Sequence, residues 1–164
     1  MGVNRVILAM IGIVMAGPAF AQGTAQQILD AHNHYRQAAG VPPLRWNSAL
    51  AAEAQRWAQH LAATGQFDHG GYGNDEGQNL WEGTAGAYSI SEMVGDWASE
   101  GRYYRSGIFP QVSTTGQWGD VGHYTQLIWR NTTDVGCGLA RGGGNDVLAC
   151  NYAPAGNVDG QPVK

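Results

Sequence analysis

The sequence predicts an α+β domain in which helices come first and an antiparallel hairpin comes last. Two segments within residues 24–63 carry apolar side chains three and four positions apart, which is helical spacing. Near the C-terminus, two strand-like segments flank the glycines of "GLARGGGNDVLA", a pattern typical of a hairpin. No repeat or linker divides the chain, so the 164 residues predict one folded domain behind an N-terminal leader.

The leader is residues 1–21, "MGVNRVILAMIGIVMAGPAFA". Arg5 near its start, an apolar run and the final Ala-Phe-Ala predict a secretory signal peptide cleaved after Ala21, which leaves residues 22–164 as the mature domain. The apolar run is short for a membrane span of roughly 20 residues, so we expect no transmembrane segment after cleavage; an uncleaved anchor is the alternative. We therefore expect a secreted or periplasmic protein, and the compact signal favours a bacterial source.

The charge of the mature chain restricts its partners. Without the leader, eight Arg and Lys residues stand against 13 Asp and Glu residues, a net charge of −5, and the one lysine is Lys164. A chain without a basic stripe is a poor match for nucleic acid or for an anionic membrane surface. We expect neither as a partner.

The first predicted helix spans residues 24–39. Thr24 and Gln27 fit a capping box at its start, and Gly40 with the following prolines ends it. Its apolar stripe contains Ile28, Ala31, His32, Tyr35 and Ala39.

The second predicted helix opens at Ser48, continues to about Ala63 and ends at Gly65. Its expected buried face contains Leu50, Ala51, Ala54, Trp57, Ala58 and Leu61. Residues 65–87 then show no clear period, and we predict a long loop. A loop of this length inside a compact domain is usually functional.

The third predicted helix follows a capping box formed by Ser89 and Glu92, and it contains "ISEMVGDWASEGR". Met93, Trp97 and Glu100 share one face, and the first two make it a buried face. A carboxylate there, at a helix C-terminus, is costly unless it is paired. The sequence therefore predicts a cationic or metal partner for Glu100; the alternative is that Glu100 frays into solvent.

Two histidines are candidate partners of Glu100. A loop over residues 107–119 precedes a predicted strand at 122–130, in which alternation places His123 on one face with Thr125, Leu127 and Trp129. His69 lies in "FDHGG", where glycines allow the backbone to approach a cleft. Each histidine taken alone also fits a purely structural role.

The two cysteines predict a disulfide. After a turn near Asn131, one strand runs through Cys137, and another spans Val147 to Tyr152. A hairpin centred between the glycines places Cys137 opposite Cys150, within bonding reach. Secretion permits the bond, and closing this loop contributes about 3 kcal/mol. Two free buried thiols are the alternative.

Asn131 also begins the glycosylation sequon "NTT", which has meaning only in a eukaryotic secretory route.

Two long motifs, "GHYTQLIWRNT" and "VLACNYAPAGNV", closely resemble the signature motifs of the CAP superfamily (cysteine-rich secretory proteins, antigen 5 and pathogenesis-related proteins). The segments "ILDAHNHYRQAAGVPPLRW", "GQNLWEG" and "DWASE" extend the resemblance over nearly the whole mature chain. The resemblance implies an α-β-α sandwich with a central antiparallel sheet.

The resemblance also implies a central cleft lined by two histidines and two glutamates. Carried over residue by residue, these are His69, His123 and Glu100, with Gln78 in place of the second glutamate. Gln78 can hydrogen-bond an imidazole but carries no charge and cannot take up a proton. Its neighbours Glu76 and Glu82 are expected on the surface.

The two imidazoles and the Glu100 carboxylate are candidate ligands of a divalent ion such as zinc, with a position open for water. A hydrogen-bonded polar cluster with no permanent metal is the other hypothesis for the cleft.

Three functions follow from these residues. The first is a secreted, non-enzymatic binding module for a sterol or fatty acid, framed by loops 65–87 and 107–119; the alternative role of their aromatic and apolar residues is to pack the loops. Those residues are Tyr72, Trp81, Tyr88, Ile108, Phe109 and Trp118. The second is a metal-dependent hydrolase with Glu100 as general base, which the missing carboxylate at Gln78 disfavours. No Ser or Cys nucleophile motif supports covalent catalysis instead. The third is a protein-interaction factor whose cleft is only structural.

Overall fold

The structure is a computed structural model that describes residues 18–164. Its elements are α1 (Pro18–Ala39), β1 (Arg45–Trp46), α2 (Ser48–Thr64), β2 (Gly77–Thr84), α3 (Ile90–Ser99), two 3₁₀ turns (Glu100–Tyr103 and Trp118–Val121), α4 (Gly122–Leu127), β3 (Asp134–Gly142) and β4 (Asn145–Ala153).

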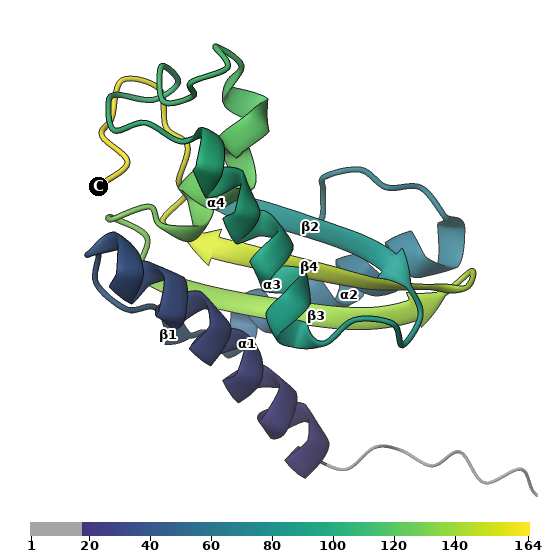
Figure 1. Cartoon of the computed structure of the whole chain (residues 1–164). Coiled ribbons are helices and arrows are strands. Elements are labelled where there is room, and N and C mark those ends of the chain that lie inside the picture. The colour runs from purple at the N-terminus through teal and green to yellow at the C-terminus, as the bar shows by residue number, and fades with distance from the viewer. Residues whose placement is uncertain (1–17) are drawn as a thin grey trace, which may run out of the picture.

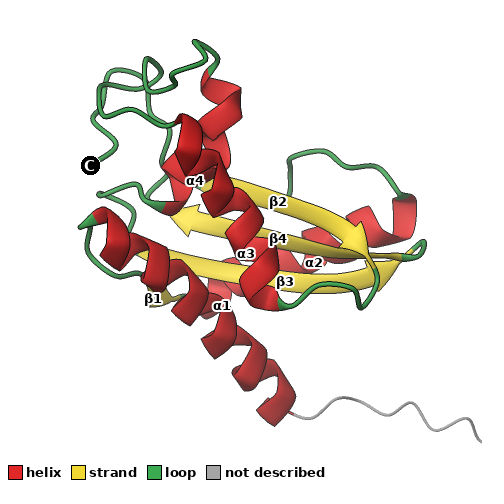
Figure 2. Ribbon diagram, viewed as in Figure 1, coloured by secondary structure: helices red, strands yellow, loops and turns green. Residues whose placement is uncertain are grey.

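The elements form three layers (Figures 1 and 2). The sheet has the order β1-β3-β4-β2. β2, β4 and β3 pair antiparallel, while the two-residue β1 joins β3 in parallel, so the sheet is mixed at this edge. α1 and α3 lie over one face of the sheet and α2 over the other. The α+β class and the α-β-α sandwich are confirmed.

The central strand β4 is buried on both faces. Leu148, Cys150 and Tyr152 point into the larger core beneath α1 and α3, whereas Val147 and Ala149 pack against α2. Side chains alternate between the faces of a strand, so these five positions are divided between the two cores. The sheet therefore separates two apolar layers, and the loops that follow α3 and β4 gather at one end of it, beside α4 (Figure 2).

Several predicted elements are confirmed. Helix α2 begins after Asn47, whose side chain accepts hydrogen bonds from the backbone N–H groups of Ala49 and Leu50, and it ends at Gly65 with φ 68°. Helix α3 has the predicted capping box of Ser89 and Glu92. The start of each helix and the end of α2 are signalled in the local sequence, which is why the pattern located them, whereas α3 ends at Ser99, three residues before the predicted end.

The hairpin and its disulfide are also confirmed. Gly143 and Gly144 connect β3 to β4 with positive φ, and Cys137 is the direct register partner of Cys150. The two cysteines form a disulfide with a Cα–Cα distance of 4.1 Å.

The start predicted for the first helix is wrong. α1 begins at Pro18, so Thr24 lies inside the helix and does not cap it. Proline is well suited to the first turn of a helix, because its missing N–H has no partner there. Residues 1–17 of the predicted signal peptide lie outside the described residues, and cleavage after Ala21 stays a prediction. Within residues 18–164, no helix is long and apolar enough to span a membrane.

The loop predicted at residues 65–87 is wrong in its second half. Residues 77–84 form β2, which pairs along its whole length with β4. Its sequence, "GQNLWEGT", combines two glycines with polar and apolar side chains and has no clean alternation. Long-range pairing with β4 defines this strand, so its local pattern was uninformative.

The strand predicted at residues 122–130 is wrong as well, because residues 122–127 form helix α4. Both ends of this short helix are satisfied by distant side chains. Glu100 accepts hydrogen bonds from the first free N–H groups, and the fully buried Arg36 donates to the carbonyls of Leu127 and Trp129. These tertiary contacts override a sequence rich in β-forming residues.

Candidate functional site

His123 is fixed at the start of α4 by Glu100. The carboxylate Oε1 lies 2.6 Å from Nδ1 of His123, and Oε2 accepts from the backbone N–H of His123 at 2.9 Å and of Tyr124 at 3.1 Å. A carboxylate only accepts, so Nδ1 carries the proton and, in the neutral imidazole, Nε2 carries the lone pair. The ring also lies nearly parallel to buried Trp97, at 6.2 Å between centroids.

His69 is fixed in the loop before β2 by Gln78. The amide Oε1 of Gln78 accepts from the backbone N–H of Gly70 at 3.2 Å, and its Nε2 donates to the Gly70 carbonyl at 2.8 Å. These two backbone partners determine which end of the amide is oxygen. Nδ1 of His69, 3.0 Å from Oε1, must therefore be the donor. The neutral ring again has its lone pair on Nε2.

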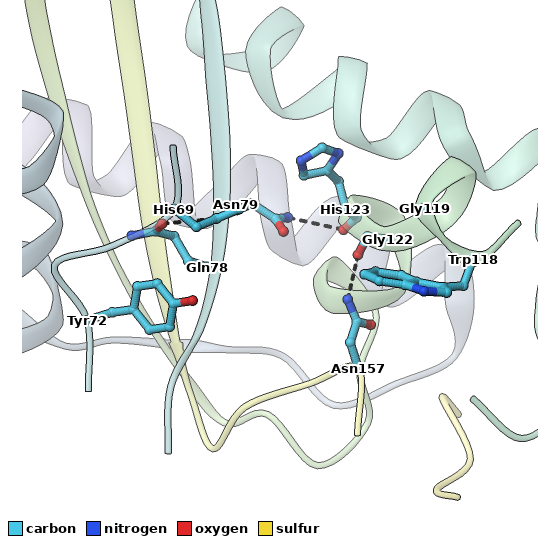
Figure 3. Close-up of a pocket in the computed structure, with 9 residues that line it drawn as sticks. All are labelled: His69, Tyr72, Gln78, Asn79, Trp118, Gly119, Gly122, His123 and Asn157. Carbon is cyan, nitrogen blue, oxygen red and sulfur yellow. Dashed lines mark hydrogen bonds between the residues drawn. The ribbon is translucent and has the colours of Figure 1, made fainter. Parts of the chain in front are cut away.

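The two histidines line one cleft of about 300 Å³. Figure 3 shows Tyr72 on one side of it and Trp118 on the other, with His123 and Asn79 between them. Tyr72 is 41% exposed and Trp118 51% exposed, so both rings are open to a ligand. The other lining residues are Gln78, Gly119, Gly122 and Asn157. The cleft therefore combines two imidazoles, amides and two accessible aromatic rings.

Two asparagines hold the backbone of α4 against the cleft. Asn79 of β2 donates from Nδ2 to the His123 carbonyl at 3.1 Å, and Asn157 donates to the Gly122 carbonyl at 2.8 Å (Figure 3). Asn157 also accepts from the Thr125 hydroxyl at 2.6 Å. The position of His123 thus depends on side chains from three separate parts of the sequence.

A buried chain of hydrogen bonds continues from Asn79 into the core. Asn79 donates to the hydroxyl of Tyr152, which lies 2.8 Å from Nε2 of His32, and Nδ1 of His32 donates to the Ile28 carbonyl. Burial lowers the pKa of His32 to about 4 and raises that of the Tyr152 hydroxyl, so both side chains are neutral near pH 7.

His32 lies close to Cys137 and Cys150, but this group is not a metal site. The two sulfur atoms are bonded to each other, and both ring nitrogens of His32 have partners. A thiolate is the form of cysteine that binds metals, and neither cysteine can provide one.

The structure brings together the four residues that the sequence singled out, in two pairs: His123 with Glu100 and His69 with Gln78. Glu100 does not line the cleft itself and is connected to it through its bond to His123. Their role in binding stays a prediction. Glu82 is exposed as expected, whereas Glu76 is half-buried and accepts a long bond from Asn151, itself a partner of Gln78.

Of the six loop residues expected to frame a ligand, Tyr72 and Trp118 line the cleft. Trp81 and Phe109 are buried, and Trp81 donates to Asp96. Sequence reasoning missed Asn79 and Asn157, although both lie inside the quoted motifs. Their roles depend on α4 being a helix, which its local pattern concealed.

Comparison with known proteins identifies the family. Residues 29–152 match the profile described as "CAP: Cysteine-rich secretory protein family". The chain belongs to the CAP family. It is 37% identical to pathogenesis-related protein 1B of Nicotiana tabacum over 93% of this chain and 88% of that protein. It is 36% identical to venom allergen 5 of Vespa mandarinia, over 84% and 77%. The predicted resemblance is confirmed.

Solved structures share the fold of this CAP domain. NaASP2, crystallised with Zn²⁺, superposes with a TM-score of 0.72 at 19% identity, covering 85% of this chain and 84% of that one. Venom allergen-like protein 4 of Schistosoma mansoni superposes with a TM-score of 0.66 at 27% identity, covering 86% and 94%. CAP proteins of this kind are secretory and bind partners.

Proposed function

We propose that this CAP protein is a secreted, non-enzymatic binding module whose cleft holds a divalent metal such as zinc between His69 and His123. One observation carries the proposal: both imidazoles line the cleft, and each donates its Nδ1 proton to a fixed acceptor, so the Nε2 lone pair is the one left to bind a metal. Metal-binding histidines usually have their second nitrogen held in this way, because the bond fixes both the tautomer and the ring orientation.

The donor set fits zinc with two protein ligands. Imidazole nitrogen is a preferred zinc ligand, and the remaining coordination positions stay open for water or for an oxygen of a bound partner. Glu100 is not one of the ligands in this proposal, since its two oxygens already accept three hydrogen bonds. A bound metal supplies a positive charge that anchors an oxygen-bearing ligand in the cleft.

The likeness to NaASP2 adds little to this argument. That protein was crystallised with Zn²⁺, but at 19% identity the likeness shows the fold alone. The case for a metal in this chain rests on its own His69 and His123.

The ligand beside the metal is proposed to be amphipathic, as a fatty acid or sterol is. Tyr72 and Trp118 present accessible aromatic faces on either side of the imidazoles. A volume of about 300 Å³ is at the lower end for small-molecule pockets, which suits the polar end of such a ligand better than the whole molecule. A protein partner that inserts one side chain is the other class of ligand.

The hydrolase hypothesis is the less favoured alternative. A general base needs a free lone pair directed at water, and the Glu100 carboxylate is already engaged by His123 and two backbone N–H groups. Among the described residues there is no free cysteine to act as a nucleophile. If zinc-loaded protein cleaved a peptide or ester library and Glu100→Gln abolished turnover, the hydrolase would replace the binding module.

The first test is zinc titration by calorimetry. We expect wild-type protein, residues 22–164, to bind zinc with micromolar or tighter affinity, and a His69→Ala/His123→Ala variant to lose this binding. His34→Ala is the control, since His34 is exposed on α1 and does not line the cleft. The control should bind as tightly as the wild type.

Two results would count against the metal. If the wild type takes up no zinc, the remaining hypothesis for the cleft is a polar cluster without metal. Fatty-acid and sterol binding would then be measured without metal. Equal binding by the double variant would locate the zinc elsewhere. Partner binding that survives in the folded double variant would favour a cleft that is only structural.

A further inference from the structure

His69 lies in an exposed loop, residues 65–76, that contains the glycines of "DHGGYG" and connects α2 to β2. Glycine-rich loops lose much conformational freedom when they are ordered, so a fixed histidine there needs specific contacts. The loop receives such contacts from two directions: Gln78 of β2 on one side and Trp57 of α2 on the other.

Trp57 binds the loop on both sides of His69. Its indole Nε1 donates to the Asp68 carbonyl at 3.0 Å. Its ring lies directly against Gly70 and Gly71, where an added Cβ would come within 2.6 and 2.8 Å of the ring carbons. His60, three residues along α2, stacks on the indole at 4.8 Å between centroids. The ring itself is therefore held in place.

The contacts of Trp57 and Gln78 are complementary. Trp57 fixes the carbonyl before His69, and Gln78 fixes the N–H and the carbonyl of the residue after it. The histidine thus lies between two anchored peptide groups, although its own side chain is exposed. A shift of either anchor would move Nε2 relative to His123.

We propose that Trp57 is a positioning residue for His69: through Asp68, Gly70 and Gly71 it sets where Nε2 of His69 lies in the cleft. The effect on metal affinity rests on the proposed function, while the effect on the loop does not. The proposal links α2, on the opposite face of the sheet from α1 and α3, to ligand binding (Figure 1).

The test compares two tryptophan variants with matched chemistry. Trp57→Phe removes the indole N–H but keeps an aromatic face for the glycines. Trp81→Phe removes an indole bond of 2.8 Å to Asp96, and Trp81 packs against Tyr88 and does not line the cleft. We expect zinc affinity to fall about 10-fold in Trp57→Phe, as for other residues that support a metal ligand, and to stay within about two-fold of wild type in Trp81→Phe.

A second readout needs no metal. In the metal-free protein, the imidazole ¹⁵N signals of His69 should report the Nδ1–H tautomer in wild type and in Trp81→Phe, and a tautomer mixture in Trp57→Phe. Exchange of the Gly70 amide, which donates to Gln78, should accelerate in Trp57→Phe alone. A merely structural tryptophan would lower stability in both variants without these local changes.

Gly70→Ala gives an independent variant in case Trp57→Phe does not fold. It leaves the indole intact but places a methyl group against it. We therefore expect the same mixture of His69 tautomers and the same fall in zinc affinity. Wild-type zinc affinity and unchanged His69 signals in a folded variant would overturn the proposal. If wild type binds no zinc, the proposed function fails, and the metal-free signals alone decide the role of Trp57.

Discussion

Glu100 connects two helices through one carboxylate. It lies at the C-terminal end of α3, where a negative charge is unfavourable, yet its oxygens accept from the first N–H groups of α4, where a negative charge is favoured. The sequence predicted that this carboxylate needs a partner, and it pointed to His123. It did not indicate the two backbone N–H groups, because α4 was expected to be a strand.

Gln78 shows why an amide suits this cleft. Its Nε2 donates to the Gly70 carbonyl and to Oδ1 of Asn151, and both of these atoms only accept. An ionised glutamate at the same place has no N–H to donate, so one of its oxygens would lie against these two acceptor oxygens without a hydrogen bond. Gln78, which stands where the resemblance implied a glutamate, therefore suits the acceptors around it better than a glutamate would.

His32 gives the protein a predictable response to acid. Burial holds its folded-state pKa at about 4, below the 6.5 of an unfolded histidine. Between these values the unfolded chain binds a proton that the folded protein does not, so stability falls as the pH drops from 6.5 to 4. The loss due to this one group is about 3 kcal/mol. Above pH 6.5 its contribution is constant.

The prediction is tested with His32→Gln. Urea unfolding at pH 7 and pH 4.5 should show a smaller drop in unfolding free energy for the variant than for the wild type, even though the variant is less stable at both values. All other ionisable groups are the same in the two proteins, so their contributions cancel in the comparison. Parallel pH dependences would show that His32 is not buried as a neutral ring.

At the scale of elements, glycines on β3 allow α2 to lie directly on the sheet. Gly136, Gly138 and Gly142 share one face, and a Cβ on any of them would overlap backbone atoms of α2. The complementary face of α2 is formed mainly by small residues such as Ala54 and Ala58. This close contact supports the helix from which Trp57 reaches the His69 loop.

Gly138→Ala should therefore destabilise the protein by about 3 kcal/mol, since the methyl group would overlap the backbone of Gln55 and force α2 outward. Gly119→Ala, where a Cβ meets nothing within 4 Å, should change stability by less than about 0.5 kcal/mol. Urea denaturation measures both. Equal stability of the two variants would mean that α2 can move away at little cost.

Elements with local signals could be predicted from the sequence, and elements made by distant contacts could not. The local signals are Asn47 and Gly65 at the ends of α2, the capping box of α3 and the glycine turn of the hairpin. β2 exists because β4 pairs with it, and α4 because Glu100 and Arg36 satisfy its ends. The histidines and Glu100 were found through motifs, whereas their supporting asparagines depend on α4.

On the scale of the whole molecule, the sandwich brings together parts of the chain that are far apart in sequence. His69 comes from the loop after α2, Gln78 and Asn79 from β2, His123 from α4 and Asn157 from the C-terminal loop. The disulfide between β3 and β4 holds the centre of the sheet to which these segments are attached. The cleft is therefore a product of the complete fold.

Anomalous diffraction at the zinc edge, from zinc-soaked crystals of residues 22–164, tests most directly whether His69 and His123 hold a metal. We predict one peak in the cleft, about 2.1 Å from Nε2 of both His69 and His123, with Glu100 still bonded to Nδ1 of His123. A cleft without a peak, or zinc bound to the Glu100 carboxylate or to a ring Nδ1, would contradict it.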